Sequence, residues 1–414
     1  MPLWPKRIDA FGKNILIVFA GSSLVNICNL LYQLLVAHKL SGPEFAAFNS
    51  LLSLFLLLAS PLVTLQLAIT KFIARFHARQ EKEKVILLLS GLFKKAAVAC
   101  GLTILIFLWL GPRLAAVLKV SSAGAVFLVG LMVASAYFSA VMSGGLQGLE
   151  VFGWFSAAAV SSSAIKLVLT FLLVSLGYSI CGALAAHFLS GVAGLAIIYF
   201  PLRLFIRLKA PRAEVNYKEM LFFLFPVAAA NFAFTALVSS DMILVKLFFS
   251  PDEAGIYSLA QMLGKIFLFL PGAVSMALFP RASAMTAQNQ NTRAILRRSL
   301  LYTFLFCAFA VAAYNLFPGP ALGLLTGKSP EASIALGRIF SVSMSLYALV
   351  YVLLAYFLSL SDMRFVWYLV VAALLQCAGI IIYHPSLFAV QALICLNSLL
   401  LFISGAYLAF RGKR

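Results

Sequence analysis

Long apolar stretches separated by short polar turns run through the whole chain. Twelve of them are long enough to cross a membrane as helices, which takes about 20 mostly apolar residues each. They cover 13–37, 45–70, 93–111, 123–145, 153–177, 179–202, 218–248, 255–280, 299–317, 333–360, 364–383 and 386–409. The pattern predicts an all-α polytopic membrane protein with about 12 transmembrane helices.

The two halves of this pattern resemble each other. The turn at 41–44 (SGPE) and the turn at 250–253 (SPDE) are each followed by a proline and, ten positions later, by a cation; these pairs are Pro61 with Lys71 and Pro271 with Arg281. The offset of 209 or 210 residues is about half of the chain. We therefore expect two pseudo-symmetric lobes of six helices, 1–202 and 218–414, joined by a basic cytoplasmic linker at 203–217, with a transport cleft between them.

The charges are distributed unevenly between the two ends of the predicted helices. The net charge is +19, and an inside N-terminus places 23 of the 31 Lys and Arg residues on the cytoplasmic side and only 6 outside. This is the positive-inside asymmetry of membrane proteins, and it predicts that both termini are cytoplasmic. The basicity therefore reflects topology and contact with membrane lipids, and we expect no nucleic-acid partner.

The composition excludes several classes of function. No connection exceeds about 20 residues, so there is no room for a soluble catalytic domain, and neither a P-loop nor a dinucleotide fingerprint occurs. The six cysteines lie in predicted helices without CxxC pairing, which predicts neither a disulfide framework nor a metal site. We expect a protein that is not an enzyme and has no cofactor, apart from a coupling H+ or Na+.

Three ionisable side chains lie well inside predicted helices, where burial of a charge is costly. Lys166 is about 20 Å from the start of its helix at 1.5 Å per residue, which predicts a wet cavity or a carboxylate beside it. Asp241 and Lys265 lie at similar depth if their helices are antiparallel neighbours. They form either an ion pair that only holds the helices together or a functional pair.

Polar amides mark further positions in the helices. Asn26, Asn29 and Gln33 are spaced by three and four residues, so they share one helix face. That face lines a cavity or makes hydrogen bonds between helices. Gln147, in a glycine-rich turn that allows close helix approach, and Asn231 are also expected to line the cavity.

Several of these stretches resemble the polysaccharide transport family of the MOP superfamily, whose members include flippases for O-antigen and capsule units. More distant relatives are lipid II flippases and MATE drug exporters. The resemblance covers essentially the whole chain. It rests on the turns around Glu44 and Glu253, the stretch 144–152 followed by Lys166, and the segments 241–246, 255–260 and 278–281.

The resemblance implies two lobes of six helices that alternate access and move undecaprenyl-diphosphate-linked oligosaccharide across the cytoplasmic membrane of a bacterium or archaeon. Asp241 resembles the acid that lipid II flippases use for a coupling cation. Those flippases add acidic or amide partners in the eleventh helix, where this chain has only Gln376. A polysaccharide polymerase or glycosyltransferases of the same pathway are the implied protein partners. The cavity cations that would receive the diphosphate are Lys71, Lys166, Lys265 and Arg281.

Two other functions are consistent with a polytopic chain. A MATE-like exporter of cationic drugs would be expected to bury more acids than cations, which is the opposite of the balance found here. A polytopic glycosyltransferase acting on lipid-linked sugars would need outward-facing carboxylates. Few are predicted: Glu44, Asp252, Glu253 and Glu331.

Overall fold

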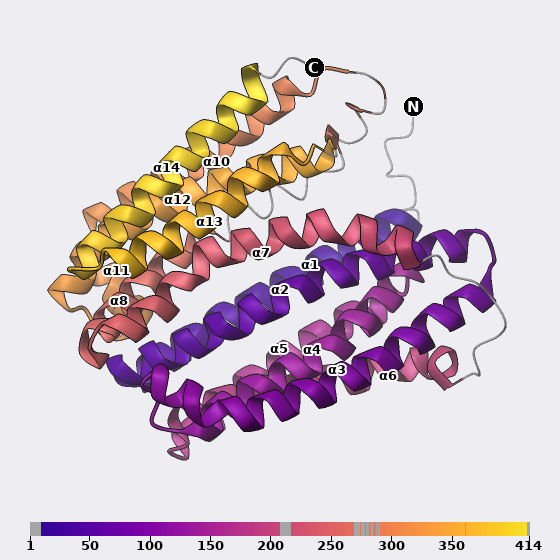
Figure 1. Cartoon of the computed structure of the whole chain (residues 1–414), viewed down its shortest axis with the longest axis horizontal. Helices are drawn as coiled ribbons and strands as arrows, with labels where there is room; N and C mark the ends of the chain where they lie inside the picture. Colours follow the sequence, from indigo (N-terminus) through magenta and orange to yellow (C-terminus); the bar gives the residue numbers. More distant parts are fainter. Residues whose placement is uncertain are drawn as a thin grey trace, which may run out of the picture. The chain divides into compact units, whose positions relative to one another are not determined.

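The computed structural model describes residues 10–207, 217–268, 290–360 and 362–411, together with 274, 278, 281, 282, 285, 286 and 288. These residues form thirteen helices and no strand, which confirms the all-α prediction. The helices, coloured along the chain in Figure 1, are α1 (Ala10–Lys39), α2 (Gly42–Ala78), α3 (Lys82–Val117), α4 (Ala123–Gly148), α5 (Phe152–Ser175), α6 (Ser179–Arg207), α7 (Tyr217–Phe248), α8 (Pro251–Ile266), α10 (Arg293–Leu316), α11 (Pro318–Thr326), α12 (Glu331–Ser359), α13 (Arg364–Ile382) and α14 (Leu387–Arg411).

Eleven helices of the described chain are long and apolar enough to cross a membrane, so the protein is a multi-pass membrane protein. They correspond to eleven of the twelve predicted stretches. The other stretch, 255–280, begins within α8, and most of its remainder lies outside the described residues. The short α11 was not predicted, because nine residues are too few to register as an apolar span.

Two helices begin at the repeated turn motif, and the structure explains the motif physically. The backbone N–H and the hydroxyl of Ser250 donate to the Glu253 carboxylate at 3.0 and 2.8 Å, and the N–H of Glu253 donates back to Ser250. Ser41 and Glu44 make the same three bonds at the start of α2. Both turns are capping boxes, which satisfy the free N–H groups of a helix start.

Contacts divide the chain into two compact units. The first contains Met1–Lys39, Pro61–Ala116 and Val120–Leu224, and the second contains Leu40–Ser60, Val117–Lys119 and Phe225–Arg414. The predicted linker at 203–217 lies largely outside the described residues, so the division into lobes at that linker stays a prediction. In the first unit α5 packs against α1 and α6, and α6 packs against α4.

Glycines set the close approach of α4 to α2 in the first unit. A Cβ atom at Gly144 would lie 2.8 Å from the carbonyl oxygen of Gln66, and one at Gly148 would lie 2.7 Å from the side chain of Ile73. Any larger residue would push the helices apart. The expectation that this glycine-rich stretch allows close packing is confirmed, and the approach brings Gln147 against α2.

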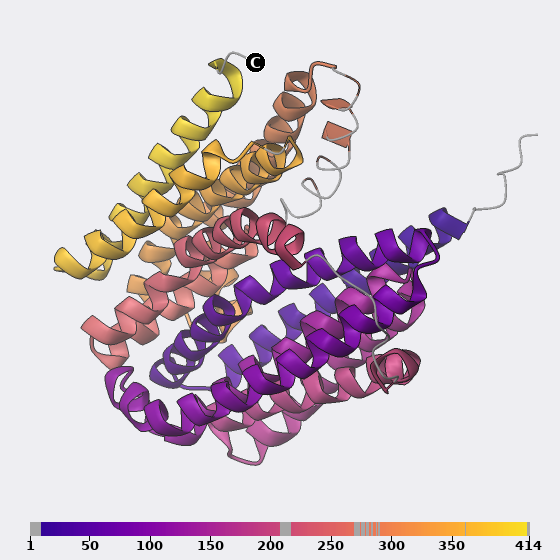
Figure 2. The ribbon, with the colours of Figure 1, turned by 45° about the vertical axis from the view of Figure 1, so that its right-hand side comes forward.

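The second unit is built around α12, which contacts α8, α10, α11, α13 and α14. Its core contains buried side chains such as Phe340, Met344 and Tyr347 of α12 and Leu237 of α7. Gly264 of α8 lies directly on Phe340 and Met344, with 3.1 Å left for a Cβ atom. In Figure 1 and Figure 2, α14 (yellow) lies alongside α13.

Candidate functional site

Asp241 is a fully buried acid in α7 that two side chains of α8 surround with hydrogen-bond donors. The hydroxyl of Tyr257 donates to its Oδ2 at 2.9 Å, and the amide of Gln261 lies 2.9 and 2.8 Å from its two oxygens. Tyr257 also lies 3.4 Å from the amide oxygen of Gln391 in α14. Without such donors, burying the carboxylate would cost on the order of several kcal/mol of folding free energy, because nothing would replace the hydration that it loses.

Helical periodicity explains how α8 supplies this environment. Tyr257, Gln261 and Lys265 follow one another at intervals of four residues, so they lie on the same face of the helix. Lys265 is half-buried at the far end of this row and interacts electrostatically with Asp241. In the part of the chain that the structure describes, no carboxylate lies within 4.0 Å of Lys265. The contact ion pair considered from the sequence is therefore not formed here.

A second buried polar cluster lies in the same unit. The hydroxyl of Tyr347 in α12 donates to the amide oxygen of Gln376 in α13 at 2.5 Å, and Asn397 of α14 donates to the same oxygen at 3.1 Å. The Gln376 amide group donates to the carbonyl oxygen of Leu237 in α7 at 2.8 Å. Four helices are thus joined through one buried amide, which ties α7 one turn before Asp241 to α12, α13 and α14.

Lys166 is buried in α5 of the first unit, with 9% of its surface exposed. Its Nζ donates to Oδ1 of Asn29 at 2.5 Å and lies 4.7 Å from the ring centre of Tyr32, both on α1. An amide oxygen and an aromatic face stabilise a cation, but neither carries a formal negative charge. Of the two alternatives that the sequence left open, a wet cavity or a carboxylate, the described residues place no carboxylate within 4.0 Å of Lys166.

The other predicted polar residues fall into two groups. Gln147 accepts hydrogen bonds from Gln66 at 3.3 Å and Thr70 at 3.2 Å, so it joins α4 to α2 beside Lys71, which is exposed. On α1, Asn26 is exposed and Gln33 is half-buried, and neither makes a hydrogen bond within the described residues. Among the described residues, only Asn29 of the three α1 amides makes a side-chain hydrogen bond to another helix, and α1 holds Lys166 through this amide and the ring of Tyr32.

Arg281 and Asn231 lie apart from these clusters within the second unit. Arg281 is exposed and lines a pocket of about 560 Å³ together with Arg298 and Tyr302 of α10. Asn231 is half-buried in α7, where its carbonyl oxygen accepts a hydrogen bond from Thr235. The structure therefore brings Asp241 near Lys265, and Lys166 next to Asn29, while Lys71 and Arg281 occupy exposed positions.

The sequence analysis missed the residues that solvate Asp241 and frame it. Gln261 and Tyr347 are common residue types in helices, and no motif singled them out. Tyr257 lies in the segment 255–260 that carries the family resemblance, but it was given no role. The signal that could have found Gln261 and Tyr257 is their spacing of four and eight residues from Lys265 on one helix face. No sequence signal shows that Tyr347 reaches Gln376, because the two residues lie on different helices.

The arrangement defines an all-helical multi-pass membrane protein with buried charged and amide groups in its helices. The fold is that of MOP-superfamily transporters. The chain is similar to the inward-facing structure of a multidrug resistance MATE family transporter of that superfamily, with a TM-score of 0.74, 15% identity, and coverage of 93% of this chain and 94% of the other. It is also similar to the lipid II flippase MurJ in an inward closed conformation, with a TM-score of 0.72, 16% identity, and coverage of 96% and 88%.

The sequence comparisons name the family. The sequence model of the polysaccharide biosynthesis protein family matches residues 11–286, and the chain belongs to that family. A membrane protein of Methanocaldococcus jannaschii, described as uncharacterized, is 25% identical over 241 residues. That match covers 54% of this chain and 56% of the relative, so it spans only about half of each length.

Proposed function

We propose that the protein moves an undecaprenyl-diphosphate-linked oligosaccharide from the inner to the outer leaflet of the cytoplasmic membrane by alternating access. Membership of the polysaccharide biosynthesis protein family supports a role in polysaccharide assembly. The name of one structural neighbour, a lipid II flippase, makes a lipid-linked sugar a natural cargo for this fold.

The observation that carries the proposal is the charge balance of the buried side chains. Within the described residues, the buried charged side chains are Lys166, Lys246 and Asp241, so cations outnumber acids. Lys166 has the neutral partners Asn29 and Tyr32. A buried ammonium with only neutral partners is stabilised further by an anion, and a diphosphate supplies one.

The test is translocation of a synthetic undecaprenyl-diphosphate disaccharide by purified protein in liposomes. Lys166→Gln should lower the rate at least tenfold, the change expected from losing one charge-assisted contact worth about 1.5–3 kcal/mol. Its melting temperature should stay the same or rise, because no buried acid loses a partner. Arg113→Gln, which removes an exposed cation stacked on Trp109, is the matched control. Unchanged translocation by Lys166→Gln would refute the role of Lys166.

A drug exporter is the second candidate, because the similarity to the MATE transporter is as strong as that to the lipid II flippase. Efflux of cationic dyes from the same liposomes separates the two, since an exporter would move the dye and leave the lipid-linked sugar in place. A glycosyltransferase would change the covalent structure of the sugar. The flippase we propose returns it intact.

Asp241 is our proposed site for a coupling proton or sodium ion. Its donors are neutral, and Lys265 is close enough to act on it but not in contact. If Lys265 approaches Asp241 in one conformation and withdraws in the other, a cation can replace it in the second. The coupling ion would then shift the equilibrium between the two conformations only by as much as its affinity for them differs.

A further inference from the structure

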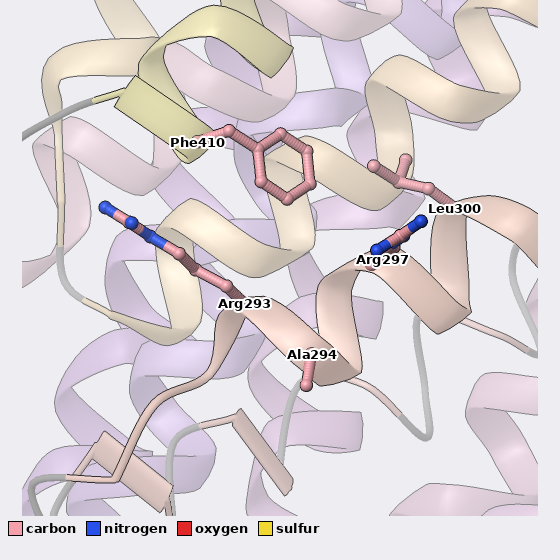
Figure 3. Close-up of a pocket in the computed structure, with 5 residues that line it drawn as sticks. All are labelled: Arg293, Ala294, Arg297, Leu300 and Phe410. Atoms are coloured by element: carbon pink, nitrogen blue, oxygen red, sulfur yellow. The ribbon is translucent and has the colours of Figure 1, made fainter.

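A pocket of about 540 Å³ lies in the second unit where α10 begins and α14 ends. Its lining consists of Arg293, Ala294, Arg297 and Leu300 of α10 and Phe410 of α14 (Figure 3). In this view the side chains of the two arginines extend on opposite sides of the Phe410 ring. Among the described residues, the lining thus combines two guanidinium groups with an apolar wall and includes no acid.

The position of the arginines near the start of α10 is not explained by the electrostatics of the helix. α10 has no acidic residue in its first turn, and the start of a helix carries partial positive charge. A cation there is slightly unfavourable for the helix, so the helix start does not account for the charge of Arg293. Among the described residues, no carboxylate lies within 4.0 Å of the Arg297 guanidinium group. A ligand with a negative charge would compensate Arg297.

Two rows of exposed apolar side chains lead away from the pocket. On α10, Leu301, Phe304 and Leu305 follow Arg297 by four, seven and eight positions, which places them on its face. On α14, Tyr407 and Ile403 precede Phe410 by three and seven positions. All five of these apolar side chains are more than half exposed.

We propose that this pocket binds the headgroup of an anionic phospholipid, whose acyl chains lie along the apolar rows of α10 and α14. Guanidinium groups bind phosphate oxygens through paired hydrogen bonds, and the apolar rows match hydrocarbon chains. Both helix ends are predicted to be cytoplasmic, on the side where membranes carry anionic lipid. A free inorganic anion would make no use of the apolar rows.

The site is distinct from the proposed cargo site. The cargo proposal rests on Lys166 in the first unit, whereas the described lining of this pocket belongs to α10 and α14 of the second unit. The two proposals can therefore be refuted independently: a variant can lose phospholipid binding and keep translocation, or lose translocation and keep phospholipid binding.

The test is the thermal stability of the purified protein in detergent, titrated with dioleoyl phosphatidylglycerol. We expect phosphatidylglycerol to raise the melting temperature and phosphatidylcholine to do so far less. The double variant R293Q/R297Q should bind phosphatidylglycerol at least tenfold more weakly, since two charge-assisted contacts are lost. The control variant K94Q/R203Q removes two exposed cations of the first unit, also predicted to be cytoplasmic, and should bind as the unchanged protein does.

Several results would overturn the proposal. Equal stabilisation by phosphatidylcholine would show that the pocket does not recognise charge. Equal losses in R293Q/R297Q and K94Q/R203Q would show that net charge, and not this pocket, attracts the lipid. Titrations with inorganic phosphate and with undecaprenyl diphosphate test other sources of phosphate. If one of these stabilises the protein but not R293Q/R297Q, while phosphatidylglycerol stabilises neither, the occupant is not a phospholipid. Unaltered melting of R293Q/R297Q without lipid confirms that the variant folds.

Discussion

Removing the charges of Asp241 and Lys265, singly and together, tests how transport is driven. Asp241→Asn keeps the shape of the side chain but turns one acceptor oxygen into an amide donor that faces Gln261 or Tyr257. Each hydrogen bond to a charged group contributes about 1–1.5 kcal/mol more than a neutral one. With contacts to Tyr257 and Gln261 at 2.8–2.9 Å, we expect Asp241→Asn to lower the free energy of unfolding by about 2–3 kcal/mol.

Lys265→Gln should behave differently, because Lys265 is half-buried and has no carboxylate within 4.0 Å in the described chain. Breaking a buried contact pair costs about 3–5 kcal/mol, whereas a separated, partly exposed pair contributes about 1 kcal/mol or less. We expect Lys265→Gln to fold normally and to lose transport driven by an ion gradient.

The assay measures melting temperature in detergent and gradient-driven translocation in liposomes for both single variants and the double variant. Coupling predicts inactive single variants and no rescue in the double variant. A permanent structural pair predicts two comparably unstable single variants, with stability and transport restored in the double variant. Restored transport would refute the coupling role and leave Asp241 as part of the scaffold.

Three further predictions concern packing, capping and topology. Gly148→Ala should destabilise the first unit by about 1–3 kcal/mol, because the new Cβ atom would lie 2.7 Å from the side chain of Ile73. The control Gly153→Ala should leave the stability unchanged, because no atom lies within 4 Å of its new Cβ atom. Equal melting temperatures of the two variants would contradict this prediction. Glu253→Ala should cost about 1 kcal/mol through loss of the capping box. Hydrogen bonds from Ser250 hold the pKa of Glu253 below its ordinary value of 4.5. The stability that the Glu253 carboxylate contributes is therefore complete above pH 4.5 and is lost as the pH falls through the lower pKa of the folded state. If Glu253→Ala destabilised the protein equally at neutral and acidic pH, the ionised carboxylate would not be the source of this stability. Single cysteines at Ser41 and Asn216, in a chain without its six native cysteines, should react with impermeant reagents from opposite sides of the membrane, and labelling from the same side would overturn the predicted topology.

The sequence alone determined the class of the protein and most of its helices. Membrane helices satisfy their backbone hydrogen bonds internally, so the length of an apolar stretch is enough to locate them. Local motifs were equally readable: the SxxE turns became capping boxes because every bond of that motif lies within four residues. The helix ends were less certain. α2 runs on to Ala78 and α3 begins at Lys82, because charged residues end an apolar stretch without ending a helix.

Tertiary structure alone decided which side chains meet. The sequence placed Asp241 and Lys265 at similar depth, but it could not show that Tyr257 and Gln261 take the contact positions around the carboxylate. It likewise could not show that Lys166 has an amide and an aromatic ring as its partners, since Asn29 is 137 residues away. Depth along a helix follows from counting residues, whereas contacts depend on the rotation and spacing of neighbouring helices. Those are fixed by packing details such as the glycines of α4, which act over long sequence separations.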